Sequence, residues 1–461
     1  MLNRDVGRPL LRYLWPVIAM LAIPRFAAAN DLARYYGLAL ARDATLQAAA
    51  SARDAAVEAR PQALAALLPQ VSASASATRE RADYANVGIA SAQTADCGLS
   101  AAAGTRRCYG TSRGLGVSLS QTLWSFQDFD QLKEADAQAA AAQAVFTGAQ
   151  QDLLLRVAKA YFGILSATDQ LDTNRREREA FSTLLEQAKV RERTGLGPRS
   201  DVEQAQAFYD ATLQSVIDAQ NALDDANLSL TVIVGARGDR VAPLREDIPL
   251  KSPQPASVDA WVDSARRDNP GVRAALLKVD AASRDIGVQR GRGLPTFMLT
   301  LSSSKLSQDP VQGGNQTLDT VGVSFRWPLF QGGAVASAIR QSRALYRQAQ
   351  AELDFAQRDT ERKTRAAFRG VESGVQRIAA AHRAVESSRD AVEAGRRNVE
   401  FGTGTEFDLL NAQNNYYTAI RAYDQARYDY LTSVLTLKQQ AGRLSERDLD
   451  AIDALLIEPQ A

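Results

Sequence analysis

Two aspartates, Asp201 and Asp408, follow glycine-containing turns with the same spacing. Asp201 lies in Gly195 to Gln206 (GLGPRSDVEQAQ) and Asp408 in Gly402 to Gln413 (GTGTEFDLLNAQ), which are 207 residues apart. A carboxylate at the start of a helix accepts hydrogen bonds from unpaired backbone N–H groups and interacts favourably with the helix dipole. Helix capping is therefore one role that the sequence indicates for both residues.

Enzymatic chemistry has no support in the sequence. The single histidine, His382, lies in a charged helical run and has no partner cluster for a Ser-His-Asp or Cys-His set. One histidine and two cysteines also argue against a metal centre ligated by these residues. The 54 basic and 53 acidic residues give no reason to expect nucleic acid as a partner. We expect no catalytic residue, no metal and no cofactor.

The repeated turn belongs to a duplication that covers the chain. Corresponding positions are Leu68-Pro69 and Leu294-Pro295, Asp43 and Asn269, and Gly116-Val117-Ser118 and Gly322-Val323-Ser324. The shift between copies falls from 226 to 206 residues along the chain, which indicates a 20-residue insertion in the first copy between Pro69 and Gly116.

The first 29 residues have the pattern of a secretory signal peptide. Arg4, Arg8 and Arg12 precede an apolar segment, and small residues lead to a cleavage site between Ala29 and Asn30. An N-terminal membrane anchor is the alternative, but the apolar segment is shorter than the roughly 20 residues that a spanning helix needs. We therefore expect export from the cytoplasm.

Both cysteines lie in the insertion. Cys97 and Cys108 are flanked by glycines in a polar segment. In an oxidising compartment two such cysteines are expected to form a disulfide, with two free thiols as the alternative.

Each copy is predicted to contain a helix, a strand, a loop, a second strand, a very long helix, a glycine turn and a last helix. The predicted strands alternate with period two and cover Val71 to Thr78, Leu115 to Leu123, Phe297 to Leu301 and Val321 to Trp327. The predicted helices are Asp31 to about Leu67, Asp128 to Arg193 and Val335 to Phe401, the last two about 100 Å long at about 1.5 Å per residue. We divide the chain into a signal peptide (1–29), a first repeat (30–235), a linker (236–256), a second repeat (257–442) and a C-terminal segment (443–461).

The strands predict a membrane protein of several chains. Their apolar residues face one way and Ser, Thr or Gly the other, yet four strands cannot close a barrel and lipid does not tolerate an open sheet edge. Three chains would supply twelve strands. Aromatic residues near the strand ends suit an interfacial belt, although they could equally cap a helical core; these are Trp124, Phe126, Phe297, Trp327 and Phe330.

With these residues in view, the chain resembles the TolC family of outer-membrane channel and efflux proteins. The resemblance rests on the two Leu-Pro junctions, the segment Gly322 to Gly333 (GVSFRWPLFQGG), both glycine-plus-aspartate turns and the ending Ala426 to Leu431, in the same order. It implies a mainly α protein with a small β part. A homotrimer would form a twelve-stranded β-barrel in the outer membrane and a helical α-barrel in the periplasm, with the linker and the C-terminal segment around its equator.

The resemblance also implies a gate at the periplasmic ends of the helices. In the family, aspartates near the start of the last helix form the narrowest ring of the pore. Asp408 occupies the first such position, and Asn411 replaces the second aspartate. One ring of carboxylates instead of two is expected to make the closed pore less selective for cations.

A latch closes this gate in the family, through a salt bridge and hydrogen bonds. Ser200 and Asp201 match its first-copy side, but Gly404 and Val399 stand where an arginine and a tyrosine are expected, so the latch is absent or is rebuilt with Arg199 or Glu406. The hairpin tips, with Gly195, Gly197, Gly402 and Gly404, are the surface where the adaptor would dock. The same glycines would allow a positive φ in the turns.

The function expected from this resemblance is a passive, gated exit duct for type I secretion or tripartite efflux. Its partners would be a periplasmic adaptor (membrane fusion) protein, an inner-membrane pump driven by ATP or protons, the exported cargo and outer-membrane lipid. The alternative is a periplasmic or surface coiled-coil scaffold that conducts nothing.

Overall fold

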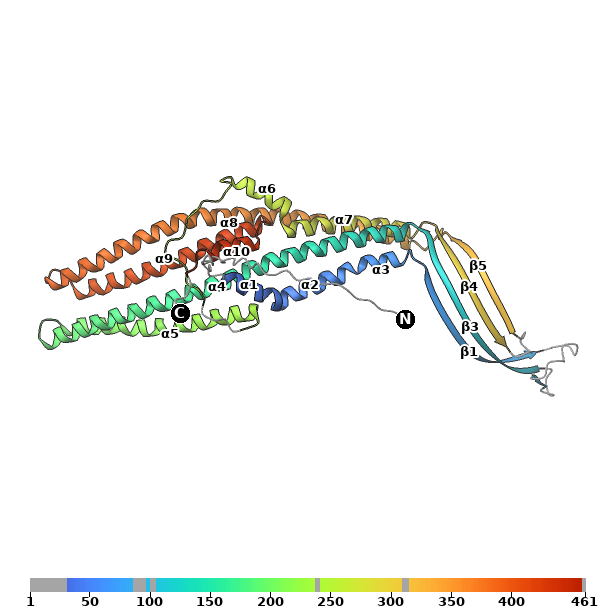
Figure 1. Cartoon of the computed structure of the whole chain (residues 1–461), viewed down its shortest axis with the longest axis horizontal. Helices are drawn as coiled ribbons and strands as arrows, with labels where there is room; N and C mark the ends of the chain where they lie inside the picture. Colours follow the sequence, from blue (N-terminus) through green and yellow to red (C-terminus); the bar gives the residue numbers. More distant parts are fainter. Residues whose placement is uncertain (1–30, 86–96, 100–104, 237–240, 309–314, 458–461) are drawn as a thin grey trace, which may run out of the picture.

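The molecule is elongated, with helices over most of its length and a β-sheet at one end (Figure 1). The computed structural model describes residues 31–85, 97–99, 105–236, 241–308 and 315–457. The predicted signal peptide and its cleavage site at Ala29 and Asn30 lie outside these residues.

The element order repeats once, as the sequence predicts. The first half contains α1 (Asp31–Arg42), α2 (Ala44–Val57), α3 (Ala59–Ala65), β1 (Gln70–Ala85), β2 (Cys97–Leu99), β3 (Thr105–Ser125), α4 (Phe126–Arg193) and α5 (Arg199–Val234). The second contains α6 (Val258–Asp268), α7 (Pro270–Gly291), β4 (Thr296–Gln308), β5 (Asn315–Arg326), α8 (Ala334–Glu400), α9 (Glu406–Gln440) and α10 (Glu446–Asp453). At about 1.5 Å per residue, the 68 residues of α4 and the 67 of α8 each extend for about 100 Å.

The segment before β1 is not one helix, contrary to the sequence prediction. It breaks at Asp43, whose side chain accepts a hydrogen bond from the backbone N–H of Leu46 at 2.7 Å and so begins α2. The same carboxylate binds Arg156 of α4. The alanine-rich sequence on both sides hides this break, because the residue that holds Asp43 in place is more than 100 positions away.

The strands form one antiparallel sheet in the order β1-β3-β4-β5, and the short β2 pairs with β3. Their partners include Val71↔Leu119, Ser118↔Ser302 and Leu301↔Val321. β1 and β5 are the outer strands of this sheet in the described part of the chain, so one side of each has no ladder partner there.

The strands are longer than predicted, and Trp327 lies just beyond β5. Backbone pairing continues through the charged residues Arg79 to Arg81 after the apolar alternation has ended. Ladder hydrogen bonds are made by the backbone, so the side-chain pattern stops before the strand does. The insertion in the first copy accordingly lengthens β1 and β3 relative to β4 and β5.

The two faces of the sheet differ in polarity. Ser72 and Ser118 lie opposite each other and their hydroxyls form a hydrogen bond of 2.8 Å. On the same face, a Cβ at Gly114 would come within 2.7 Å of the Ser76 hydroxyl. The other face carries exposed apolar residues, namely Val71, Leu115, Val117, Leu301, Val321, Val323 and Phe325. An apolar face of this size that remains exposed in one chain is typical of contact with lipid or another subunit.

The main hydrophobic core lies midway along the helices, where α1, α10 and the linker pack on α4 and α9. The hydroxyl of Tyr161 donates to Asp31, and the buried Asp453 accepts from the N–H groups of Leu32 and Ala33 at 2.9 Å. Leu244 of the linker and Leu456 of the C-terminal segment form an isolated β-bridge. These contacts hold the linker and the C-terminal segment against the long helices.

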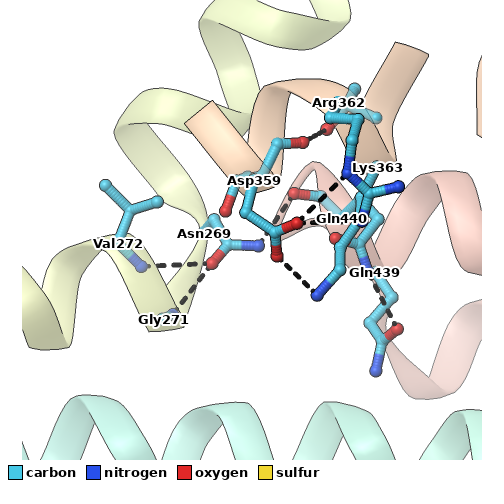
Figure 2. A network of polar contacts seen from close by, with 10 residues as sticks. Asn269, Gly271, Val272, Asp359, Arg362, Lys363, Gln439 and Gln440 are labelled. Carbon is cyan, nitrogen blue, oxygen red and sulfur yellow. Dashed lines mark hydrogen bonds and ion pairs between the residues drawn. The ribbon is translucent and has the colours of Figure 1, made fainter. Parts of the chain in front are cut away.

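Asn269 organises the equivalent helix start in the second half (Figure 2). Its side-chain oxygen accepts from the N–H groups of Gly271 and Val272, and its amide donates to the carbonyl of Gln440 at 2.9 Å. Beside it Asp359 of α8 binds Lys363 at 2.7 Å. The start of α7 is thereby tied to the end of α9.

Within the described residues, no helix is both long enough and apolar enough to cross a membrane.

Candidate functional site at the hairpin tips

The helical hairpins α4–α5 and α8–α9 end in turns of the same construction, at the end of the molecule remote from the sheet (Figure 1). In the first turn the N–H of Leu196 donates to the carbonyl of Arg191 at 2.8 Å. In the second turn the N–H of Thr403 donates to the carbonyl of Asn398, also at 2.8 Å. Gly195 has a φ of 74° and Gly402 a φ of 72°. The repeated sequence therefore encodes a repeated helix end in which a left-handed glycine follows the helix.

The second glycine of each turn has another role than predicted. Positive φ values occur at Gly195 and Gly402, not at Gly197 and Gly404. A Cβ at Gly197 would lie 3.3 Å from the Cβ of Arg191, and one at Gly404 would lie 2.8 Å from the Cβ of Asn398. These two glycines are required for close approach to the preceding helix and not for an unusual φ.

Asp201 and Asp408 differ in their surroundings although their positions correspond. Thr405 caps α9: the N–H of Asp408 donates to the Thr405 hydroxyl at 3.1 Å, and that hydroxyl donates to the Asp408 carboxylate at 2.6 Å. The corresponding cap of α5 is Pro198, which has no hydroxyl. Asp408 is thus part of a capping box and is exposed, whereas Asp201 is half-buried.

An ion pair joins the two tips. The guanidinium of Arg191 at the end of α4 lies 2.9 Å from the carboxylate of Glu406 in the first turn of α9. The Glu406 side chain is only 3% exposed. Burial raises the pKa of Glu406, the neighbouring Asp201 raises it further, and Arg191 opposes both effects. Asp201, Arg191 and Glu406 therefore form one electrostatic cluster between the first and second halves.

This cluster was only partly predicted. The sequence indicates Glu406 as a candidate partner in a rebuilt latch, and Glu406 does form an ion pair across the two halves. Arg199 instead pairs with Glu203 one turn along its own helix. Arg191 was missed, because no sequence signal says that the end of α4 lies beside the start of α9. Ser200 is exposed.

An apolar cluster packs behind the ion pair. Phe181 is 1% exposed and its ring stacks on Phe208 with centroids 5.3 Å apart. The cluster comprises Phe181, Leu184, Leu185, Ala188, Ala205, Val392, Val399, Leu409 and Leu410. It draws on all four helices of the two hairpins, so it holds the tips together within one chain.

A second polar contact crosses the same seam nearer the middle of the molecule. Arg421 of α9 lies 2.5 Å from Glu177 of α4 and donates to Asn174 at 3.1 Å. Burial raises the pKa of Glu177, and the hydrogen bond from Arg421 opposes the shift. The α4–α9 seam therefore contains buried carboxylates that depend on arginine partners.

A groove of about 1070 Å³ runs between the tips of α4 and α8. Leu196 and Phe401 line it and are each 76% exposed. Its polar lining includes Arg191, Glu406 and the charged residues Glu186, Arg396 and Glu400.

The residues expected at a pore constriction lie in the first two turns of α9. Asn411 donates its side-chain amide to the carbonyl of Phe407 at 2.9 Å. Asp408 and Asn411 are one turn apart, so their side chains lie on the same side of α9. That this side of α9 faces a pore stays a prediction.

The aromatic residues expected at a membrane interface gather at the junction of sheet and helices. Trp124 and Phe297 are opposite each other in the β3–β4 ladder, and the Trp124 ring contacts Phe126 and Phe129. Trp327 is 54% exposed and Phe330 87% exposed. They are near one another and accessible, while their depth in a membrane stays a prediction.

Cys97 and Cys108 are direct register partners between β2 and β3. Their backbones are thus adjacent, but their side chains lie outside the described residues, so the disulfide stays a prediction. Among the described residues, no three His, Cys, Asp or Glu side chains form a group that could hold a metal ion.

Known proteins resemble the chain over almost its whole length. The family described as outer membrane efflux protein matches residues 35–236 and 261–443. The chain is 31% identical to the outer membrane protein TolC of Vibrio cholerae serotype O1, over 96% of this chain and 98% of that protein. It is 30% identical to the alkaline protease secretion protein AprF of Pseudomonas aeruginosa, over 97% of this chain and 91% of that protein. The structure of CusC superposes with a TM-score of 0.76 at 17% identity, covering 90% of this chain and 92% of CusC, which shows a shared fold.

Proposed function

This chain belongs to the outer membrane efflux protein family, and from that membership we propose that it is a trimeric exit duct in the outer membrane. The observation that carries the proposal is the family match in both halves of the chain. The family consists of transport channels and not of enzymes, and its strands lie in the outer membrane while its helices extend through the periplasm. The non-conducting scaffold that the sequence left open has no comparable support.

Trimer formation is supported by the open edges of the sheet. β1 and β5 each have one side without a ladder partner in the described part of the chain, next to an exposed apolar face. An unpaired edge in lipid leaves backbone N–H and C=O groups unsatisfied at a cost of several kcal/mol each. Pairing of β5 with β1 of the next subunit around a threefold axis would close a twelve-stranded barrel.

The Arg191–Glu406 ion pair and the apolar cluster behind it are proposed to hold the periplasmic mouth closed. They join the α4–α5 hairpin to the α8–α9 hairpin. If the hairpins separate on opening, the buried Glu406 loses its partner and becomes hydrated. In the closed mouth, Asp408 and Asn411 would line the constriction, Asp408 as a ring of three carboxylates and Asn411 as a neutral ring. Ser200 and Asp201 would stand at the same level.

The partners are proposed to be a periplasmic adaptor protein and an inner-membrane pump. The groove between the tips presents the exposed apolar side chains of Leu196 and Phe401 among polar lining residues, a mixed surface suited to an adaptor hairpin. The glycine turns at Gly195, Gly197, Gly402 and Gly404 would border it. The name of AprF refers to protease secretion; by analogy, a secreted protein is one cargo for this chain and small molecules are another.

The test is reconstitution of the purified full chain in planar bilayers. We expect trimers that dissociate on heating in SDS and that produce discrete, low conductance steps in the closed state. The same preparation heated before reconstitution serves as the control. A monomer in detergent, or an intact trimer that inserts and never conducts, would contradict the duct.

A further inference from the structure

The β1–β3 pair extends beyond the rest of the sheet at the end remote from the helices (Figure 1). Its ladder continues to Ala85↔Thr105, whereas β3 leaves β4 at Ser112↔Gln308. With the helices in the periplasm, this end of the sheet faces the cell exterior.

One face of the sheet changes from apolar to basic towards this end. Residues directly opposite in an antiparallel ladder share a face. On the apolar face Lys305 lies opposite Leu115, Arg113 lies opposite Ala77, and Arg79 lies opposite Thr111. Arg79, Arg113 and Lys305 are all exposed. The basic residues therefore continue the apolar face and do not belong to the serine-rich face.

The three cations form a diagonal row across β1, β3 and β4. Arg79 and Lys305 are each a diagonal neighbour of Arg113, a relation that places residues about 7–8 Å apart. Against these three cations, the described side chains at this end of the face include one carboxylate, Asp319 of β5, which lies opposite Ser303. The row therefore carries a net positive charge. Neighbouring cations in it are close enough for one or two phosphate groups to contact both.

The depth of the row matches the outer boundary of a membrane. From Trp124 to Arg113, β3 covers about 36 Å at about 3.3 Å per residue, or about 28 Å of depth at the usual strand tilt of about 40°. An outward-facing apolar band in such sheets is about 25 Å tall. When the aromatic residues lie at the periplasmic interface, Arg113 lies at the level of the outer-leaflet headgroups.

A shallow groove of about 400 Å³ lies next to the row. It is lined by Ala73, Ala75, Leu115, Val117, Ser303 and Lys305, all on the apolar face, and by the adjacent Ser74 and Gly116. Small side chains on β1 beside larger ones on β3 leave room for a hydrocarbon chain. Lys305 at its rim is therefore next to both an apolar channel and Arg113.

We propose that Arg79, Arg113 and Lys305 bind the phosphate groups of a phosphorylated lipid in the outer leaflet, whose acyl chain lies in the adjacent groove. This assignment rests on the outer-membrane position proposed above. A guanidinium donates paired hydrogen bonds to phosphate oxygens, and Lys305 adds a point charge. A ligand with an anionic head and an apolar tail fits this surface, because cations and an apolar groove adjoin at the depth where headgroup meets hydrocarbon.

The experiment measures binding of bis-phosphorylated lipid A to the detergent-solubilised trimer of the full chain by native mass spectrometry. Zwitterionic phosphatidylcholine and inorganic phosphate are the comparison probes. We expect tight binding of the bis-phosphorylated lipid, weak binding of phosphatidylcholine and no competition by millimolar inorganic phosphate. Each single change, Arg79→Ser, Arg113→Ser or Lys305→Ser, is expected to weaken lipid binding about fivefold, and the triple variant more than tenfold.

Matched controls separate charge from structure. Arg113→Lys keeps the charge but loses the paired hydrogen bonds of the guanidinium, so it is expected to bind more tightly than Arg113→Ser and less tightly than wild type. Arg326→Ser removes a cation from the opposite end of the same sheet, at the end of β5, and is expected to leave binding of lipid A unchanged. Equal binding by wild type and the single serine variants would overturn the proposal, and so would full competition by inorganic phosphate.

Conductance in planar bilayers separates this proposal from the duct function. Serine variants that form trimers and conduct like wild type but lose lipid binding support the lipid site. Variants that conduct and still bind lipid A normally refute the lipid site and leave the duct intact. A wild-type protein that binds lipid A but never conducts refutes the duct function alone.

Discussion

Arg156 of α4 holds both carboxylate oxygens of Asp43 at 3.0 Å, while Asp43 caps the start of α2. Its counterpart in the second half, Asn269, caps α7 in the same way but is held by the carbonyl of Gln440. Both halves thus keep a side-chain cap at this helix start. The capping side chain is held by the Arg156 guanidinium in the first half and by the Gln440 backbone carbonyl in the second.

The Asp43 carboxylate is expected to stabilise the fold at neutral pH. Burial alone would raise its pKa, but hydrogen bonds from Arg156, Thr45 and the N–H of Leu46 outweigh burial and hold the pKa at about 2. Because this pKa lies below that of the unfolded chain, the stabilisation is complete above about pH 4 and is lost as the pH falls towards about 2.

Asp43→Asn keeps the cap and removes the charge, so it should destabilise the protein by about 2 kcal/mol at pH 7. Thermal unfolding of the detergent-solubilised trimer at pH 7 and pH 3 measures the effect, which should shrink at pH 3. Asp54→Asn, which alters an exposed pair with Arg53, is the control and should change little. A loss of stability that is the same at both pH values would mean that the charge is not responsible.

The Arg191–Glu406 pair is expected to restrain opening. Arg191→Ala leaves the buried Glu406 without its partner, a change that typically costs about 3–5 kcal/mol when the site stays dry and less when the tip hydrates. The closed state should lose stability relative to the open state, so the conductance of single trimers should rise.

Charge exchange distinguishes a latch from general disruption. Arg191→Glu combined with Glu406→Arg should restore part of the low conductance that either single change removes. Arg199→Ala is the control, since Arg199 is exposed and pairs within α5. A double variant as conductive as the single variants would show that the ion pair does not close the mouth.

Features of the fold and of the candidate site could be predicted where they depend on residues close together in the sequence. The order of elements and the repeated turns follow from local patterns, since Gly195 and Gly402 need a left-handed φ wherever the hairpins lie. The support of Asp43 by Arg156, by contrast, and the proposed latch of Arg191 and Glu406 depend on distant contacts. These contacts join residues more than 100 positions apart, and no periodicity in the sequence reports them.

The repeat itself misled the interpretation at one pair of positions. Gly197 and Gly404 share the glycine spacing of their neighbours, which predicts a shared need for positive φ. Their constraint is instead the space left by Arg191 and Asn398 on the preceding helix. The repeat in the sequence shows a glycine at both positions, but it does not show the physical reason that glycine is needed there.

Asp408 and Asn411 are expected to set the ion selectivity of the closed mouth. Asp408→Asn removes three carboxylates from the trimer and should lower the preference for cations, whereas Asn411→Asp adds three and should raise it. Reversal potentials under a potassium chloride gradient measure both changes. Asp408→Glu keeps the charge and is the control. Because Asp408 also belongs to the capping box of α9, Asp408→Asn should cost about 0.5–1 kcal/mol of stability as well.

If selectivity is unaffected by both changes, the carboxylate of Asp408 serves only the helix cap. In that case Asp408→Asn would lower the stability of the protein without shifting the reversal potential. The two roles are therefore separable in the same set of variants.

Asp424 is expected to make the protein less stable as the pH rises from 5 to 8. It lines a cavity of about 810 Å³ between α4, α8, α9 and the linker, together with Asp169, Glu246 and His382. Burial raises the pKa of Asp424 to about 6, Asp169 adds to the shift, and Arg427 opposes it. Since the folded pKa lies above the unfolded one, the stabilising contribution is complete below about pH 4 and is lost as the pH passes about 6.

Asp424→Asn should therefore flatten the dependence of the unfolding temperature on pH between 5 and 8. The effect should be about 1 kcal/mol per subunit, because the site is partly open to water and screening reduces it. Asp172→Asn is the control on α4, since Asp172 is 55% exposed, and a His382→Gln background removes the only histidine as a second source of pH dependence. A wild-type profile that Asp424→Asn leaves unchanged in that background would exclude Asp424 as its cause. A flattened profile would show that the packing of α9 against α4 at mid-length depends on a proton at Asp424.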